Sequence, residues 1–249
     1  MLDQSHGGRD QTRVHLLRRF EVRHSEHSVS LSPAGQRLVA FLALNMGPLT
    51  RIYVAGTLWI DYRQDAANAN LRTALWRLSR LSCPLIDATP THLSLAADVT
   101  VDVHEALAIA KRAGVNRDDV HEWELERLMA AGELLPDWYD DWTVFERERF
   151  RQMRLHALER ICDELRCQRR LDKALEVGLS AVASEPLRES AHRAVMRVHL
   201  AEGNAAEAFR QYDLFRGLLQ SRLGVLPSDE MERLLRRCAG RDDAVTAAR

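Results

Sequence analysis

Residues 66–81, AANANLRTALWRLSRL, are the stretch on which the N-terminal fold depends. At about 100° per residue, a helix over this stretch gathers apolar side chains on one face: Leu71, Ala74, Leu75, Leu78 and Leu81. The opposite face carries Ala69, Arg72, Thr73, Trp76, Arg77 and Arg80. No acidic residue occurs between residues 66 and 86. The stretch therefore predicts a helix that packs through its leucines and turns arginine, threonine and tryptophan side chains outward.

Two shorter helices are predicted before this one. Ser32 is a suitable N-cap and Pro33 a suitable first residue for the earlier helix. The Gly47-Pro48 pair ends it. Thr50 is the expected N-cap of the second helix, RIYVAGTLWI.

Short strands flank the three helices. Residues 13–31 mix β-branched and charged residues and predict two or three strands, with a turn at the HSEH segment. Asp65 is the expected N-cap of the third helix. Residues 85–95 predict a hairpin that bends at Thr89-Pro90. Strands, three helices and a hairpin in this order are typical of a winged helix-turn-helix.

The remainder of the chain has a helical pattern throughout. A short linker is expected at 96–100, and helices are predicted over 102–113, 117–131, 144–168, 171–184, 188–202, 205–222 and 228–238. Ala174 is followed 34 residues later by Ala208, and Ala181 lies between Ala174 and Pro186. Small residues with this period are typical of tetratricopeptide (TPR) repeats, in which helix pairs stack. The predicted fold is therefore mainly α: a winged helix-turn-helix DNA-binding domain over residues 1–100 and an all-α, TPR-like domain over residues 101–249.

Composition restricts the function classes. The chain has 249 residues, 46% hydrophobic and 29% charged, which is an ordinary globular balance. The chain has 35 Lys and Arg residues and 36 Asp and Glu residues, which gives a net charge of -1. The overall charge therefore does not indicate a class of binding partner. The polar N-terminus, four scattered cysteines and the absence of a long apolar run predict a cytoplasmic protein with no membrane segment.

The motifs of common enzyme classes are missing. The chain has two lysines, Lys111 and Lys173, and neither follows a glycine, so no Walker A sequence occurs. The sequence G-x-S-x-G is absent as well. A metal site is suggested by the short sequence distances among Cys162, Cys167 and His156. The favoured interpretation is that the cysteines are buried and structural. We expect no enzymatic activity, no cofactor and no metal.

The outer face of the third helix is the candidate DNA-binding site. Arginine can contact guanine in a bidentate manner or bind phosphate, and threonine can contact a thymine methyl group. The alternative is an ordinary solvated helix face. Trp76 stacks on the DNA backbone or covers the edge of the core. The predicted DNA-binding residues are Asn68, Arg72, Thr73, Trp76, Arg77 and Arg80. The hairpin has no arginine or lysine, so weak wing contacts are expected.

An aromatic group follows Pro136. Trp138, Tyr139 and Trp142 are interpreted as packing residues at the core or domain junction. Ligand stacking is the alternative, because repeat domains bind partners on concave faces.

Three segments carry a family resemblance. Residues 31–59 and 67–81 resemble the winged-helix domain of the Streptomyces antibiotic regulatory protein (SARP) family. GELLPDWYDDWTVFERERFRQMRLHALERI (132–161) and residues 183–235 resemble the bacterial transcriptional activator domain of that family. The segment Thr-His-Leu-Ser-Leu in the hairpin and Ser79 in the third helix depart from common family residues, which affects the expected base preference.

The resemblance implies a transcriptional activator for a biosynthetic gene cluster that binds direct repeats near a promoter as a homodimer. It also implies recruitment of RNA polymerase through the sigma factor, with Asp61, Tyr62 and Arg63 as contact candidates. An effector of the repeat domain is left open. The rival hypothesis is a TPR-type interaction or ligand-sensing module whose winged helix binds protein.

Overall fold

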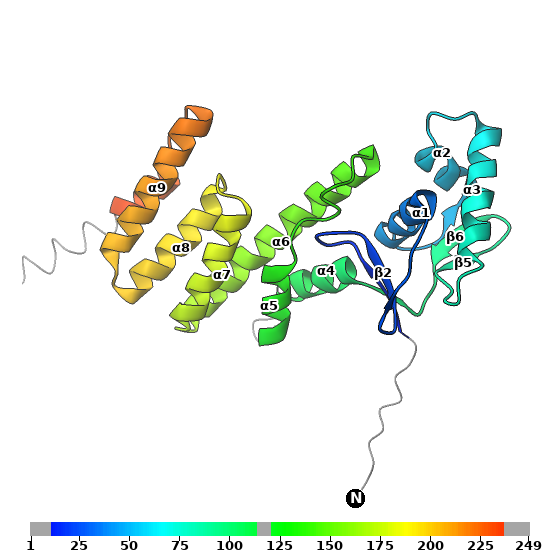
Figure 1. The fold of residues 1–249 in the computed structure, drawn as a ribbon. Coiled ribbons are helices and arrows are strands. Elements are labelled where there is room, and N and C mark those ends of the chain that lie inside the picture. Colours follow the sequence, from blue (N-terminus) through cyan, green and yellow to red (C-terminus); the bar gives the residue numbers. More distant parts are fainter. Residues whose placement is uncertain (1–10, 114–120, 237–249) are drawn as a thin grey trace, which may run out of the picture. The chain divides into compact units, whose positions relative to one another are not determined.

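The computed structural model describes residues 11–113 and 121–236, and most of them are helical (Figure 1). The chain divides into two compact units. The first comprises Met1–Ala106 with Ala131–Arg151, and the second Leu107–Ala130 with Gln152–Arg249. The predicted class, mainly α with an N-terminal winged helix-turn-helix and a helical domain, is confirmed. The predicted functional boundary at residue 100 stays a prediction.

A four-stranded sheet opens the first unit. Its strands are β1 (Thr12–His15), β2 (Glu21–His24), β3 (His27–Ser28) and β7 (Val99–Val101), in the order β3-β2-β1-β7. Val14 pairs with Val22 across the antiparallel β1–β2 ladder and with Val101 across the parallel β1–β7 ladder, and all three are buried. The strands expected within 13–31 are confirmed. The expected linker at 96–100 is wrong, because residues 99–101 add a strand to this sheet.

Three helices follow, each close to its predicted place. Helix α1 (Pro33–Leu44) is capped by Ser32, and α2 (Arg51–Leu58) by Thr50, which accepts from Tyr53 N at 3.4 Å. Helix α3 (Gln64–Leu78) starts earlier than predicted and ends three residues before Leu81. Asp65 does not cap it: the N-cap is Arg63, which has no side-chain capping bond, and Asp65 lies in the first turn.

The predicted hairpin is the wing. It consists of β5 (Ile86–Ala88) and β6 (His92–Leu95), and the bend is closed by Thr89 N donating to His92 O at 2.9 Å. A third strand, β4 (Leu49–Thr50), pairs with β6, so the sheet order is β4-β6-β5. This pairing attaches the segment before α2 to the wing.

Residues 131–151 pack within the first unit. Leu135 N donates to Leu16 O at 2.9 Å, Arg18 N donates to Glu133 O at 2.7 Å, and Leu17 forms a β-bridge with Leu134. These long-range backbone bonds join the segment 131–151 to the end of β1.

The aromatic group lies in this segment. The Trp138 and Trp142 rings meet edge to face at 6.1 Å, and Trp142 also contacts Phe41 of α1 at 5.2 Å. The packing interpretation is therefore confirmed for the two tryptophans. Tyr139 does not join them, because its side chain is 89% exposed.

The remaining helices build the second unit. They are α4 (Asp102–Arg112), α5 (Glu122–Ala130), α6 (Asp141–Cys167), α7 (Leu171–Ser184), α8 (Glu189–Glu202) and α9 (Ala205–Leu223), followed by helical residues 229–236. Helices α4 and α6 each begin in the first unit. The beginning of the predicted helix 117–131 lies outside the described residues. Of the helices in 11–113 and 121–236, none is long and apolar enough to cross a membrane.

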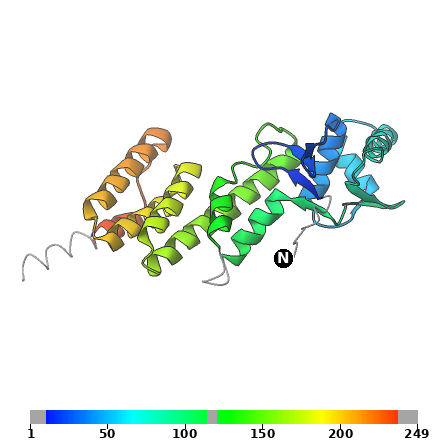
Figure 2. The same ribbon diagram turned by 60° about the horizontal axis from the view of Figure 1, so that its bottom comes forward.

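Helices α7, α8 and α9 lie side by side in Figures 1 and 2. Ala174, Ala181 and Ala208, the small residues of the predicted repeat, are fully buried. Gly178 lies on the same stripe of α7, where an added Cβ would come within 2.9 Å of a Val195 methyl carbon. The small side chains therefore permit the close approach of α7 and α8 that stacked helix pairs need.

His192 is buried in α8 beside Phe215, with ring centroids 4.4 Å apart. Its Nε2 lies 2.9 Å from Pro186 O, and its Nδ1 lies 2.8 Å from Gln211 Nε2. A neutral ring protonated at Nε2 donates to Pro186 and accepts from Gln211, so both bonds suit the uncharged form. Burial lowers the pKa of His192.

We expect the free energy of unfolding to fall as the pH drops below about 6.5, the ordinary histidine pKa. There the unfolded state takes up a proton that the folded state, with its lowered pKa at His192, does not. Urea unfolding at pH about 7.5 and about 5.5, on either side of that pKa, measures the effect. His192→Gln removes this titration and should show a smaller loss; an equal loss in both proteins would assign the pH dependence to other groups.

Candidate nucleic-acid interface

Helix α3 is held by its apolar face. Ala67, Leu71, Ala74 and Leu78 are buried, and Leu75 is half-buried. These side chains pack against α1 and α2. The predicted division of the helix into a buried face and an outward face is therefore confirmed, although Leu81 lies beyond its end.

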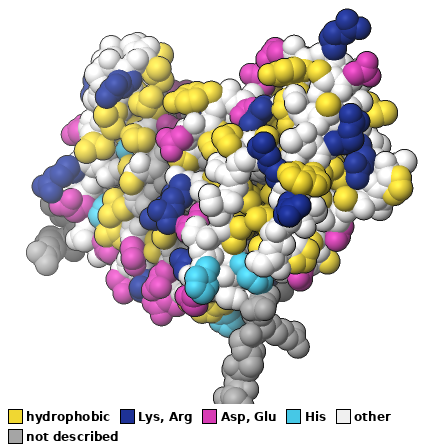
Figure 3. Space-filling model, turned by 45° about the vertical axis from the view of Figure 1, so that its right-hand side comes forward, with side chains coloured by type: hydrophobic (Ala, Val, Ile, Leu, Met, Phe, Trp, Pro, Cys, Tyr) yellow, Lys and Arg dark blue, Asp and Glu magenta, His cyan; other side chains and the backbone are white. Residues whose placement is uncertain are grey.

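The outward face carries unpaired cations. Arg72, Arg77 and Arg80 are exposed, and within 11–113 and 121–236 their side chains make no hydrogen bond or ion pair. Lys and Arg side chains gather on the right-hand part of the face drawn in Figure 3, with hydrophobic side chains between them. An unpaired guanidinium group keeps its donors available for an anion or a base edge.

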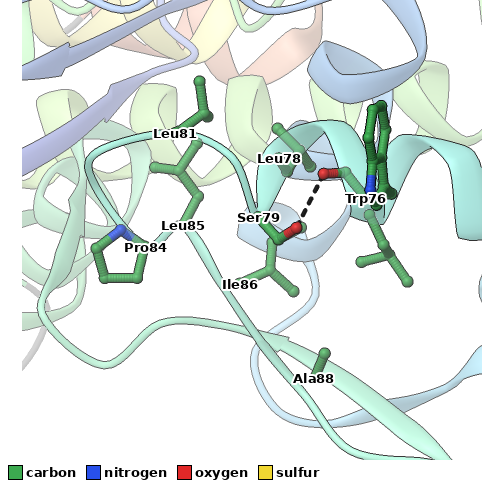
Figure 4. A pocket seen from close by; sticks show the side chains of 9 residues that line it. Trp76, Leu78, Ser79, Leu81, Pro84, Leu85, Ile86 and Ala88 are labelled. Atoms are coloured by element: carbon green, nitrogen blue, oxygen red, sulfur yellow. Dashed lines mark hydrogen bonds between the residues drawn. The ribbon is translucent and has the colours of Figure 1, made fainter.

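Trp76 is shared between this face and an apolar groove. Its side chain is 59% exposed, and the Arg80 guanidinium carbon lies 5.1 Å from its ring centroid, a cation–π contact. The groove, with a volume of about 460 Å³, lies between the end of α3 and β5 (Figure 4). It is lined by Leu75, Trp76, Leu78, Ser79, Leu81, Pro84, Leu85, Ile86 and Ala88. Trp76 thus borders the groove, as expected of a residue that covers the edge of the core, and it also contacts Arg80. Its stacking on the DNA backbone stays a prediction.

The two smaller polar candidates, Asn68 and Thr73, each make a side-chain hydrogen bond within α3. Asn68 is half-buried, and its side-chain oxygen accepts from Gln64 Nε2 at 3.3 Å. Thr73 is exposed, and its hydroxyl donates to Ala69 O at 3.0 Å. Its methyl group and the hydroxyl lone pairs stay available for contacts.

The turn before α3 holds the three candidates for a polymerase contact. Asp61, Tyr62 and Arg63 are exposed, and Tyr62 N donates to Trp59 O at 3.0 Å. The structure brings these residues together at one end of α3, and their contact with the polymerase stays a prediction.

Arg51 was missed by sequence reasoning. It begins α2, yet its Nε donates to Thr89 O at the bend of the wing, at 2.8 Å. An arginine directly after a helix cap gives no local signal of a contact with a hairpin 38 residues away.

The cysteines of the metal alternative differ in their surroundings. Cys162 is buried as expected, and burial raises the pKa of its thiol to about 12. The expectation of a buried cysteine is wrong for Cys167, which is exposed. Across the described part of the chain, no group of three or more His, Cys, Asp or Glu side chains is arranged to hold a metal ion.

Comparisons with known proteins identify a family domain in the chain and a likeness to solved structures. Residues 131–238 match the bacterial transcriptional activator domain. The chain is similar to the solved structure "Mycobacterium tuberculosis EmbR in complex with low affinity phosphopeptide", with a TM-score of 0.74, 17% identity, and coverage of 94% of this chain and 66% of that one. At this identity the likeness shows a shared fold, and the chain spans less than two thirds of the length of that structure. No curated protein matches the chain.

Proposed function

We propose that the chain is a transcriptional regulator of the SARP type that activates transcription by binding duplex DNA through the outward face of α3. The match of residues 131–238 to the bacterial transcriptional activator domain supports this proposal. Arg72, Arg77 and Arg80 contact guanine edges or phosphates, assisted by the residues Asn68, Thr73 and Trp76. The observation that carries this proposal is a set of exposed arginines, without a partner among the described residues, on a helix whose other face is buried.

The finer features come from the SARP resemblance. We propose binding to direct repeats near the promoter of a biosynthetic gene cluster, as a homodimer on the DNA. RNA polymerase is recruited through the sigma factor, with Asp61, Tyr62 and Arg63 at the contact. The protein acts by binding and not as an enzyme.

A salt titration tests duplex binding. The probe is a labelled random-sequence duplex of about 30 base pairs, roughly three helical turns, followed by fluorescence anisotropy. Phosphate contacts release counterions, so the logarithm of the affinity should fall linearly with the logarithm of salt concentration, with a slope of about −0.9 per phosphate contacted. Three arginines on phosphates would give a slope of about −2.7.

The same titration addresses the rival function. An affinity that does not change between about 50 and 200 mM salt, the range over which counterion release is large, would contradict DNA binding by this face. It would favour a winged helix that binds protein.

A further inference from the structure

The wing carries no cation of its own. In residues 85–95 the charged side chain is Asp87, and His92 is the one titratable base. A wing of this composition repels a phosphate backbone at neutral pH, because its formal charge is negative.

The fold brings a cation to the wing from another element. Thr50 of β4 pairs with His92 of β6, which places Arg51 beside the bend of the hairpin. Arg51 N donates to Thr91 O at 2.9 Å, and Arg51 Nε donates to Thr89 O at 2.8 Å. One backbone bond and one side-chain bond therefore attach Arg51 to both sides of the bend.

Arg51 is half-buried, and the outer nitrogens of its guanidinium group are not committed to a partner in the described part of the chain. Its Nη1 and Nη2 atoms make no hydrogen bond or ion pair within the described ranges 11–113 and 121–236. Thr89, Pro90 and Thr91 around it are exposed. A guanidinium group that is already oriented through Nε loses less freedom when its remaining N–H groups bind phosphate.

We propose that Arg51 and the bend at residues 89–91 form a phosphate clamp that binds the duplex backbone outside the groove contacted by α3. This inference rests on the proposed function, and it adds a second contact surface to that site. The partner is the phosphodiester backbone of double-stranded DNA. Such contacts position a protein on the duplex without reading its sequence.

Arg51→Gln is the sharpest test. Glutamine carries an amide nitrogen as far from the backbone as Nε of arginine, so it can keep the bond to Thr89 O while the positive charge is lost. The random-sequence duplex is a suitable probe, because phosphate contacts do not depend on sequence. We expect the salt slope to become shallower by roughly one unit, with several-fold weaker binding at low salt.

Two variants control the result. Arg51→Lys keeps the charge and should retain a slope near that of the wild type. Arg19→Gln removes another exposed arginine of the first unit, which is paired with Glu21 and far in sequence from the wing, and it should leave the slope unchanged. Thermal unfolding of each variant checks that the wing region remains folded.

The outcomes separate the clamp from the proposed function. If the wild type shows no salt-dependent duplex binding, the proposed function fails. If the wild type binds and Arg51→Gln keeps the full slope, the clamp alone is overturned. An equal loss of slope in Arg51→Gln and Arg51→Lys would also overturn it, because wing geometry and not charge would then explain the effect.

Discussion

We expect that replacing Arg77 and Arg80 with alanine weakens promoter binding strongly and leaves the chain folded. Both side chains are exposed and contribute nothing to the core. Each bidentate contact to a base is worth about 1–3 kcal/mol of discrimination, so the loss of one contact lowers specific affinity by roughly 5- to 150-fold. Loss of both should leave mainly the weaker, sequence-independent binding.

Fluorescence titration measures this loss on a bound site identified by genome-wide mapping. Comparison with the random-sequence duplex separates base contacts from phosphate contacts: a base contact changes the ratio of the two affinities, whereas a phosphate contact changes both and the salt slope. Arg19→Ala serves as the matched control. Unchanged affinity in both single variants would contradict the assignment of α3 as the DNA-reading helix.

The Trp76→Ala variant probes the same face, and we expect it to lower the affinity for DNA by less than the arginine substitutions do. Trp76 supports Arg80 through a cation–π contact at 5.1 Å. Such a contact at an exposed position is worth about 0.5–1 kcal/mol. We therefore expect the arginine substitutions to be the stronger test of DNA binding by this face.

Phe215→Ala is expected to cause the largest loss of stability. Phe215 of α9 is fully buried, and it packs in a core cluster with Met196, Ala208 and Met231. Truncating a buried phenylalanine removes its transfer free energy and leaves a cavity, at a cost of about 3–5 kcal/mol. His192, whose ring lies 4.4 Å away, would lose its neighbour as well.

Urea unfolding followed by circular dichroism measures this effect. Phe209→Ala is the matched control, because Phe209 lies on the same helix and is 40% exposed. We expect its loss to be well under half of that at Phe215, since less apolar area leaves water there. Comparable losses at the two positions would show that the cluster around Phe215 does not hold the last helix pair together.

Several features were predictable because they depend on neighbours in sequence. The two faces of α3 follow from helical periodicity, and the caps Ser32 and Thr50 follow from the hydrogen bonds that a helix start requires. The buried alanines of α7 and α9 follow from a repeat of small residues. The exposed arginines of α3 were identified in this way.

The wrong predictions for residues 99–101 and for Asp65 have a different cause. Val99–Val101 is too short to be distinguished from a linker, and it becomes a strand only because β1 offers it a parallel partner. Asp65 is a good cap by residue type, but the chain enters the helix at Arg63, where the turn from Trp59 ends.

By itself, the sequence determined which helix turns arginines outward and which segments repeat, since periodicity and capping act within a few residues. Only the tertiary structure decided that residues 131–151 join the first unit through Leu16 and Arg18, and that Arg51 lies at the bend of the wing. Both depend on hydrogen bonds between segments far apart in the chain, where the partner of a backbone N–H or C=O group leaves no pattern in its own neighbourhood.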